Sequence, residues 1–231
     1  DLGARLDCPG ALAGVDCLVH CAARVHRLDE RTGAALQRYR QVNVAGSLRL
    51  AELAAAQGVR RFVFISSIKV LAERTAAGAV LTGATPPAPV DPYGISKLEA
   101  ETALARLCAA SGIELVVIRP TLVHGPGAGG NLERLLRVLH RGWPLPLAGI
   151  DNARSMLSLG NLVDLIVHAS THPAAAGAVL LAADPTPVST SRLLRLLAAG
   201  LDRPARLFHL PPQLLRAAAA VTGRSAMVGR L

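Results

Sequence analysis

The sequence of 231 residues is poor in aromatic side chains and almost devoid of lysine. Phenylalanine, tryptophan and tyrosine make up 3% of it, and Lys69 and Lys97 are the two lysines among basic residues that are otherwise arginine. Surfaces that bind nucleic acids usually combine a basic patch with aromatic side chains that stack on bases. The net charge of +9 is scattered along this chain, so we expect no nucleic-acid partner. The positive charge instead favours small anionic substrates.

Long apolar runs are also missing from the sequence. The uncharged stretch at residues 174–183 is far shorter than the ~20 residues that a membrane-spanning helix needs. Asp1, Arg5 and Asp7 interrupt the first residues, which do not resemble a secretory signal. We therefore expect no membrane span and a cytoplasmic location.

Cysteine and histidine are too few and too dispersed to indicate a metal site. The cysteines are Cys8, Cys17, Cys21 and Cys108. They show no Cys-x-x-Cys spacing, so free thiols in a reducing compartment are expected. His168 and His172 are four residues apart, but no acidic third ligand is placed with them. We predict no bound metal.

Against this background, one of the two lysines lies four residues after one of the two tyrosines, in Tyr93-Gly-Ile-Ser-Lys97. Chance would give this spacing roughly 0.02 times in a chain of this composition. Residues four apart on a helix share one face. An ammonium beside a phenol favours the phenolate, which can remove a proton from a hydroxyl group. The alternative is an exposed helix face with an incidental pair.

The order of apolar runs and turn residues predicts alternating strands and helices. Strands are predicted at residues 15–20, 61–65, 113–118, 155–159 and 178–182. Helices are predicted at residues 34–57, 91–112, 131–141, 160–172 and 189–201, and residues 72–92 form a loop. Continuous Val, Ile and Leu runs between helices are typical of a parallel sheet that is covered on both faces. The predicted fold class is α/β, with a Rossmann-like doubly wound sheet.

Several polar residues follow predicted strands directly. Ser66 and Ser67 come after one strand, and residues 120–125 come after the next, with the Tyr93 helix between them in sequence. In a doubly wound sheet, ligands bind at the carboxyl ends of the strands. The sequence therefore predicts a site at this edge, although the two serines could also satisfy backbone groups at the strand end.

At this point the sequence resembles a known family, the extended short-chain dehydrogenases/reductases, and within it the NAD-dependent nucleotide-sugar epimerases and dehydratases. The resemblance rests on five segments in the order and approximate spacing of the family, and it extends over nearly the whole chain. The segments are VDCLVHCAA (15–23), NVAGSLRLAELAAAQGVRRFVFISS (43–67), DPYGISKLEAE (91–101), IRPTLVHGPG (118–127) and NLVDLI (161–166).

The resemblance implies catalytic roles for three residues. Tyr93 would be the general base, Lys97 would lower the pKa of Tyr93 and hold the nicotinamide ribose, and Ser67 would hydrogen-bond the reacting hydroxyl. The implied NAD-binding residues, in addition to Tyr93 and Lys97, are Asp1, Leu2, Cys21, Ala22, Ala23, Asn43, Ser66, Pro120 and Val123. The implied substrate-binding residues are Ser67, Asn131 and Arg154. Asn43 could instead be a solvated helix residue, and Arg154 a surface arginine.

A glycine-rich loop at residues 125–130 imitates the fingerprint that binds dinucleotide phosphates. We interpret it as a substrate loop, because residues 120–124 separate it from the preceding strand. The family's fingerprint would then lie on a strand upstream of Asp1. We accordingly expect a chain truncated at both ends, which is inactive by itself. Residues 1–123 would be the remaining NAD-binding domain, and residues 124–231 would mainly bind substrate, interleaved with late Rossmann elements.

The resemblance implies a nucleotide-sugar substrate and suggests a homodimer. Ile68 and Lys69 replace the Asp-Glu pair of the family's dehydratases, which disfavours dehydration. The main interpretation is NAD-dependent epimerisation at C4 of a UDP-hexose or UDP-N-acetylhexosamine through a 4-keto intermediate. The alternatives are an NAD(P)-dependent 4-keto-sugar reductase or dehydrogenase and a non-catalytic dinucleotide-binding protein.

Overall fold

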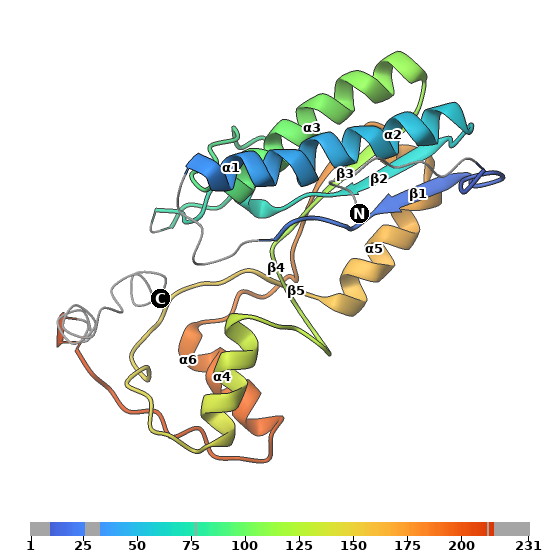
Figure 1. Cartoon of the computed structure of the whole chain (residues 1–231). Coiled ribbons are helices and arrows are strands. Elements are labelled where there is room, and N and C mark those ends of the chain that lie inside the picture. The colour runs from blue at the N-terminus through green and yellow to red at the C-terminus, as the bar shows by residue number, and fades with distance from the viewer. Residues whose placement is uncertain (1–9, 26–32, 77, 212, 215–231) are drawn as a thin grey trace. The chain divides into compact units, whose positions relative to one another are not determined.

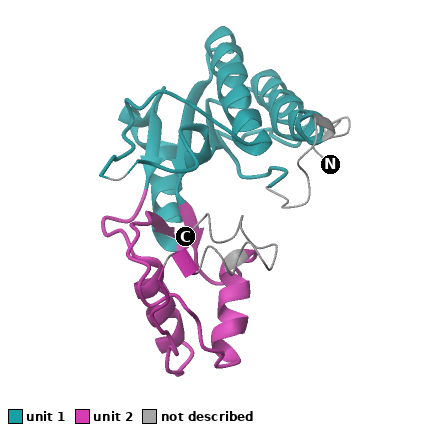
Figure 2. Ribbon diagram, turned by 90° about the vertical axis from the view of Figure 1, so that its left-hand side faces the viewer, with its two compact units in different colours: residues 1–121, 160–182 teal, residues 122–159, 183–231 magenta. Residues whose placement is uncertain are grey.

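The structure, a computed structural model, describes residues 10–25, 33–76, 78–211 and 213–214 (Figure 1). These residues form two compact units (Figure 2). Unit 1 contains residues 1–121 and 160–182, and unit 2 contains residues 122–159 and 183–231. The chain thus leaves unit 1 after residue 121, two residues before the division expected from the sequence, and returns to it for residues 160–182.

A four-stranded parallel sheet forms the centre of unit 1. Its strands are β1 (Cys17–His20), β2 (Arg61–Ile65), β3 (Glu114–Pro120) and β6 (Val179–Ala182), in the spatial order β1-β2-β3-β6. All three strand pairs are parallel, as the apolar runs predicted. The carboxyl ends of these strands therefore share one edge of the sheet, which fixes where the predicted site residues lie.

Helices cover both faces of this sheet (Figure 1). On one face lie α1 (Gly33–Tyr39), α2 (Gly46–Ala56) and α3 (Pro92–Ser111), and α5 (Leu159–Thr171) lies on the other. Phe62 and Phe64 of β2 are fully buried in the core that the sheet shares with α2 and α3. The predicted α/β class with a covered parallel sheet is confirmed.

The ends of α3 follow from its sequence. The Asp91 side chain accepts a hydrogen bond of 2.6 Å from the backbone N–H of Gly94, and Pro92 occupies the first turn. Aspartate at the cap followed by proline is a favourable helix start. Gly112 ends the helix with a φ of 76°, which residues with a side chain rarely adopt.

The predicted helix at residues 34–57 contains an irregularity that its sequence pattern did not indicate. A π-helix, η1 (Arg40–Ala45), separates α1 from α2. Such π-helical turns are uncommon and occur often at functional sites. Asn43 lies in this turn and is only 1% exposed.

Unit 2 is built from short elements around its own apolar cluster. Strands β4 (Leu122–His124) and β5 (Met156–Ser158) pair in parallel, separately from the four-stranded sheet. Helices α4 (Asn131–His140) and α6 (Thr190–Ala199) bury Leu139, Leu194 and Ala198 between them. Two short 3-10 helices complete the described elements, η2 (Ile68–Val70) and η3 (Pro173–Ala175). In the described part of the chain, no helix has the length and apolar character that crossing a membrane requires.

Candidate active site

Helix α3 places Tyr93 in its first turn and Lys97 one turn later. Lys97 is 1% exposed, and its ammonium lies 3.9 Å from the centre of the Phe64 ring. Burial lowers the pKa of Lys97 to about 7, against the opposing charges of Glu101 and Cys21. This ammonium is therefore poised to lose or gain a proton near neutral pH, which an arginine could not do.

The Tyr93 phenol is half-buried at the start of the same helix. Burial is the main cause that raises its pKa to about 12, a hydrogen bond with Ser67 acts in the opposite direction, and the charges of Asp91 and Tyr39 raise it further. The sequence led us to expect that Lys97 would lower this pKa. In the described chain that effect is not seen, because desolvation of the phenol dominates and the buried lysine itself holds its proton weakly.

The two serines after β2 have different surroundings. The backbone N–H of Ser66 donates to the carbonyl of Ile118 at 2.7 Å, which extends the β2–β3 pairing by one residue. The Ser66 hydroxyl is buried and has no hydrogen-bond partner among the described residues. Ser67 caps η2, and its Oγ accepts from the backbone N–H of Lys69 at 3.3 Å. Its hydroxyl therefore faces both the η2 turn and the Tyr93 phenol.

The Asn43 side chain joins three segments of the site. Its Oδ1 accepts from the backbone N–H of Arg24 at 2.8 Å, and its Nδ2 donates to the Arg24 carbonyl at 3.1 Å. Nδ2 also donates to Ser96 Oγ at 3.0 Å, and that hydroxyl donates to the Tyr93 carbonyl at 2.8 Å. Asn43 thereby holds the segment after β1 against the turn of α3 that carries Tyr93.

Motif analysis overlooked His20, the last residue of β1. Its Nε2 lies 2.8 Å from Ser47 Oγ, and its ring packs against Phe62 and Phe64. Burial, with a smaller effect from the charge of Lys97, lowers the pKa of His20 to about 4. The signal was present in the sequence, since a histidine at the end of an apolar strand is unusual enough to mark a polar network.

The remaining predicted residues of unit 1 lie at the same edge of the sheet. Cys21, Ala22 and Ala23 follow β1 directly, and the Cys21 thiol is close enough to influence the pKa of Lys97. Pro120 is the buried last residue of β3. The next residue, Thr121, has a buried hydroxyl without a hydrogen-bond partner in the described part of the chain.

Other predicted residues belong to unit 2 or lie beyond the described residues. Val123 is in β4, and Arg154 forms backbone hydrogen bonds with Val188. Arg154 Nε donates to Thr190 Oγ1 at 3.3 Å, and burial lowers its pKa. Asn131 is the first residue of α4, and its side chain is not among those described. Two residues expected to bind the cofactor, Asp1 and Leu2, fall outside the described residues.

The glycine-rich loop at residues 125–130 follows β4 and leads into α4 within unit 2. It thus does not follow a strand of the four-stranded sheet. Gly127 and Gly130 have φ values of 78° and 70°, and a Cβ atom on Gly125 would lie 2.8 Å from Leu159 Cβ. Backbone conformation and close packing within unit 2 therefore account for glycine at these three positions.

A parallel Rossmann-like sheet with a serine, tyrosine and lysine at its carboxyl edge defines a short-chain dehydrogenase/reductase. The sequence profile of the NAD dependent epimerase/dehydratase family matches residues 3–181. The chain therefore belongs to the NAD-dependent epimerase/dehydratase family, as the motifs implied.

Two curated relatives are epimerases. The chain is 43% identical to a UDP-glucose 4-epimerase of Vibrio cholerae over its whole length, which is 71% of that protein. It is 30% identical, over 87% of its length and 59% of the relative, to an N-acetyl-alpha-D-glucosaminyl-diphospho-ditrans,octacis-undecaprenol 4-epimerase of Escherichia coli O157:H7.

Solved structures show the same fold. A UDP-glucuronic acid 4-epimerase of Bacillus cereus in complex with NAD superposes with a TM-score of 0.75 at 21% identity, over 91% of this chain and 65% of that one. MoeE5 in complex with UDP-glucose and NAD gives a TM-score of 0.69 at 26% identity, over 86% of this chain and 67% of that one. The Rossmann-like class is thus confirmed by comparison.

Proposed function

We propose that this chain carries the catalytic centre of an NAD-dependent nucleotide-sugar 4-epimerase that acts on a UDP-hexose or UDP-N-acetylhexosamine through a 4-keto intermediate. The observation that carries the proposal is the meeting of Ser67, Tyr93 and Lys97 at one edge of the sheet, in a chain 43% identical to a UDP-glucose 4-epimerase. Neither the spacing of Tyr93 and Lys97 nor the Rossmann-like fold would by itself indicate 4-epimerase activity.

The residues at the edge of the sheet suit a dinucleotide. The buried hydroxyls of Ser66 and Thr121, which lack partners among the described residues, are available to hydrogen-bond a ligand. Lys97 offers an ammonium to ribose hydroxyls, and residues 21–23 offer small side chains beside it. NAD, when bound, accepts a hydride from C4 of the sugar and returns it.

The protein's own residues would move the proton and hold the sugar. Tyr93 Oη takes the proton of the C4 hydroxyl as that carbon is oxidised, and returns it when the carbon is reduced from the opposite face. Ser67, whose hydroxyl lies close enough to Tyr93 to lower its pKa, would orient the same hydroxyl. Asn43 holds the segment of residues 21–24 against α3. It would therefore affect cofactor binding indirectly, by positioning that segment.

Unit 2 would supply most of the contacts with the nucleotide sugar, as we expect for residues 124–231. Arg154 is partly buried beside Thr190 and Asn152, where its forked donors suit a diphosphate. Asn131 and Ser67 complete the proposed substrate residues, and Val123 would pack on the nicotinamide. Asp1 and Leu2 would contact the adenosine.

The proposal is tested by incubating the full-length protein that contains residues 1–231 with NAD and either UDP-glucose or UDP-N-acetylglucosamine and separating the products by chromatography. We expect the C4 epimer, with no net change in NADH absorbance. Stoichiometric accumulation of NADH would favour the dehydrogenase or reductase alternative. Cofactor binding without any turnover would favour the non-catalytic one. Tyr93→Phe is the control, because it removes only the hydroxyl.

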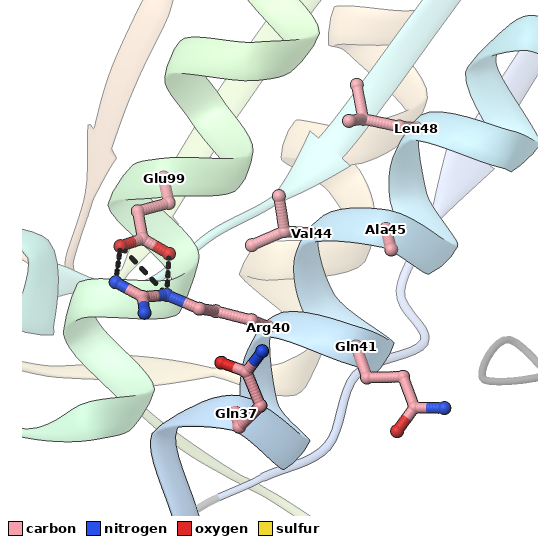
Figure 3. Close-up of a pocket in the computed structure, with 7 residues that line it drawn as sticks. All are labelled: Gln37, Arg40, Gln41, Val44, Ala45, Leu48 and Glu99. Carbon is pink, nitrogen blue, oxygen red and sulfur yellow. Dashed lines mark hydrogen bonds and ion pairs between the residues drawn. The ribbon is translucent and has the colours of Figure 1, made fainter. Parts of the chain in front are cut away.

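A homodimer is a further part of the proposal. A groove on α1, η1 and α2 is bordered by Glu99 of α3, and Arg40 forms a double hydrogen bond with Glu99 across it (Figure 3). Apolar Val44, Ala45 and Leu48 line the same groove. Analytical ultracentrifugation of Val44→Glu against the unchanged protein tests this face, since a buried charge would dissociate the dimer. A cytoplasmic location stays a prediction from the sequence.

A further inference from the structure

The loop that carries Ser67 and the helix that carries Tyr93 are joined by a closed set of contacts around Lys69 and Asp91. The Lys69 backbone N–H donates to Ser67 Oγ, and its ammonium forms an ion pair with Asp91 Oδ2. The other carboxylate oxygen, Asp91 Oδ1, accepts from the Gly94 N–H at 2.6 Å. The Tyr93 phenol, between Asp91 and Gly94 in sequence, lies close enough to the Ser67 hydroxyl for that group to lower the pKa of Tyr93.

The backbone at this point is also tightly packed. A Cβ atom on Gly94 would lie 2.6 Å from the Lys69 carbonyl oxygen and 3.2 Å from Pro89 Cβ. The η2 turn and the first turn of α3 therefore approach each other closely through backbone atoms. The ion pair between Lys69 and Asp91 joins the same two turns through side chains. A change in either charge would act directly on the distance between Ser67 and Tyr93.

The ion pair is partly shielded from solvent. The Lys69 side chain is 26% exposed and the Asp91 side chain 15%. A fully exposed pair has little effect, whereas one at this depth is screened less by water and salt. The charges of Lys69 and Asp91 therefore act more strongly on neighbouring groups than those of an exposed pair would.

The Tyr93 phenol is a titratable group on which the charge of Asp91 acts. The groups facing Tyr93 are Asp91, Tyr39 and Ser67, with Lys97 one turn further along α3. Of these, the carboxylate of Asp91 opposes formation of a phenolate, because like charges repel. Asp91 also caps α3, and the cation of Lys69 offsets its charge.

We propose that Lys69 is a positioning residue, whose ion pair with Asp91 holds Ser67 against Tyr93 and balances the carboxylate beside the phenol. The proposal rests on the function proposed above, in which Tyr93 is the base. A direct contact of Lys69 with an anionic substrate would be a different role, and the ion pair disfavours it because the ammonium is already engaged by Asp91.

Four variants form a complete test. Lys69→Met removes the cation at similar volume, Lys69→Arg keeps it, Asp91→Asn keeps the helix cap without the charge, and the fourth combines Lys69→Met with Asp91→Asn. The first measurement is the pH dependence of kcat in the full-length protein with NAD and a UDP-hexose. The second is the carbon-13 ring resonance of labelled tyrosine with pH, which needs no substrate. Only two tyrosines are present, so Tyr93→Phe assigns the signal.

Lys69→Met should move the rising limb of the pH profile upward by about one pH unit, or about a tenfold loss of kcat at a fixed pH below that limb. Asp91→Asn alone should move it downward. In the pH of this limb, the combined variant and Lys69→Arg should lie close to the unchanged protein. The midpoint of the Tyr93 resonance should follow the same order.

Equal midpoints for Lys69→Met and the unchanged protein would overturn the proposal. So would a rise in KM for Lys69→Met with an unshifted pH profile, which would indicate a substrate contact instead. If the full-length unchanged protein does not epimerise any UDP-hexose or UDP-N-acetylhexosamine, the proposed function fails. The order of the Tyr93 midpoints would then still decide the role of Lys69.

Discussion

Acid should destabilise this protein through one buried histidine. His20 is 3% exposed, and its pKa in the folded chain is lowered from 6.5 to about 4 by burial first and the Lys97 charge second. Above pH 6.5 the imidazole is neutral in both the folded and the unfolded states. As the pH falls toward 4, the unfolded chain binds a proton that the folded chain excludes, so the free energy of unfolding decreases.

The size of the effect follows from the two pKa values of His20. A tenfold change in a protonation constant is about 1.4 kcal/mol, so the full depression corresponds to a loss of about 3 kcal/mol. The loss is complete once the pH falls below the folded pKa of about 4, because both states are then protonated. This is a substantial share of the ~5–15 kcal/mol that stabilises a typical domain.

The perturbation is His20→Phe, which keeps a ring against Phe62 and Phe64 and removes the titrating group. Urea unfolding followed by circular dichroism at several pH values between 8 and ~4 gives the free energy of unfolding. The variant should lose about 3 kcal/mol less than the unchanged protein over this range. A matched control is His168→Gln, which changes an exposed histidine of α5. Parallel curves for His20→Phe and the unchanged protein would refute the reasoning.

Further predictions concern the catalytic residues and two glycine positions. Tyr93→Phe should lower kcat by about 10²–10⁴-fold in the epimerase assay, and more than a tenth of the original rate would exclude Tyr93 as the base. Lys97→Arg should also fail, because a planar guanidinium does not fit the buried site over Phe64; near-normal turnover would contradict this role. Gly94→Ala should cost about 1–3 kcal/mol in urea unfolding, since its Cβ meets the Lys69 carbonyl, whereas Gly160→Ala meets nothing within 4 Å and should be close to neutral. A structure with NAD bound should show the pyrophosphate away from residues 125–130, and contacts with their backbone amides would reverse our interpretation of that loop.

Local sequence signals determined most of the architecture. Apolar runs at residues 61–65 and 113–118 predicted two central strands, which the structure has as β2 and β3. The Asp91-Pro92 start and the Gly112 stop predicted α3 to within a residue, since caps and stops depend on neighbouring backbone groups. The spacing of Tyr93 and Lys97 predicted a shared helix face, because residues four apart lie about one helical turn apart.

Tertiary structure alone decided how the site residues behave. The pairing of Lys69 with Asp91 joins residues 22 apart in sequence, and no local pattern reports it. The π-helix at Arg40–Ala45 contains Asn43, whose side chain bonds to the distant Arg24 and Ser96. Both features depend on segments far away in the sequence, which helix propensity does not describe.

The ionisation of Tyr93 and Lys97 also depends partly on local sequence and partly on tertiary structure. The sequence predicted a tyrosine and a lysine one turn apart on a helix, and α3 contains both. From that spacing we expected a lowered pKa for Tyr93. The structure raises the pKa of Tyr93 to about 12 and lowers that of Lys97 to about 7, because both groups are buried. Spacing along a helix determines which charges can meet, but desolvation depends on everything packed around them, and only the folded chain decides that.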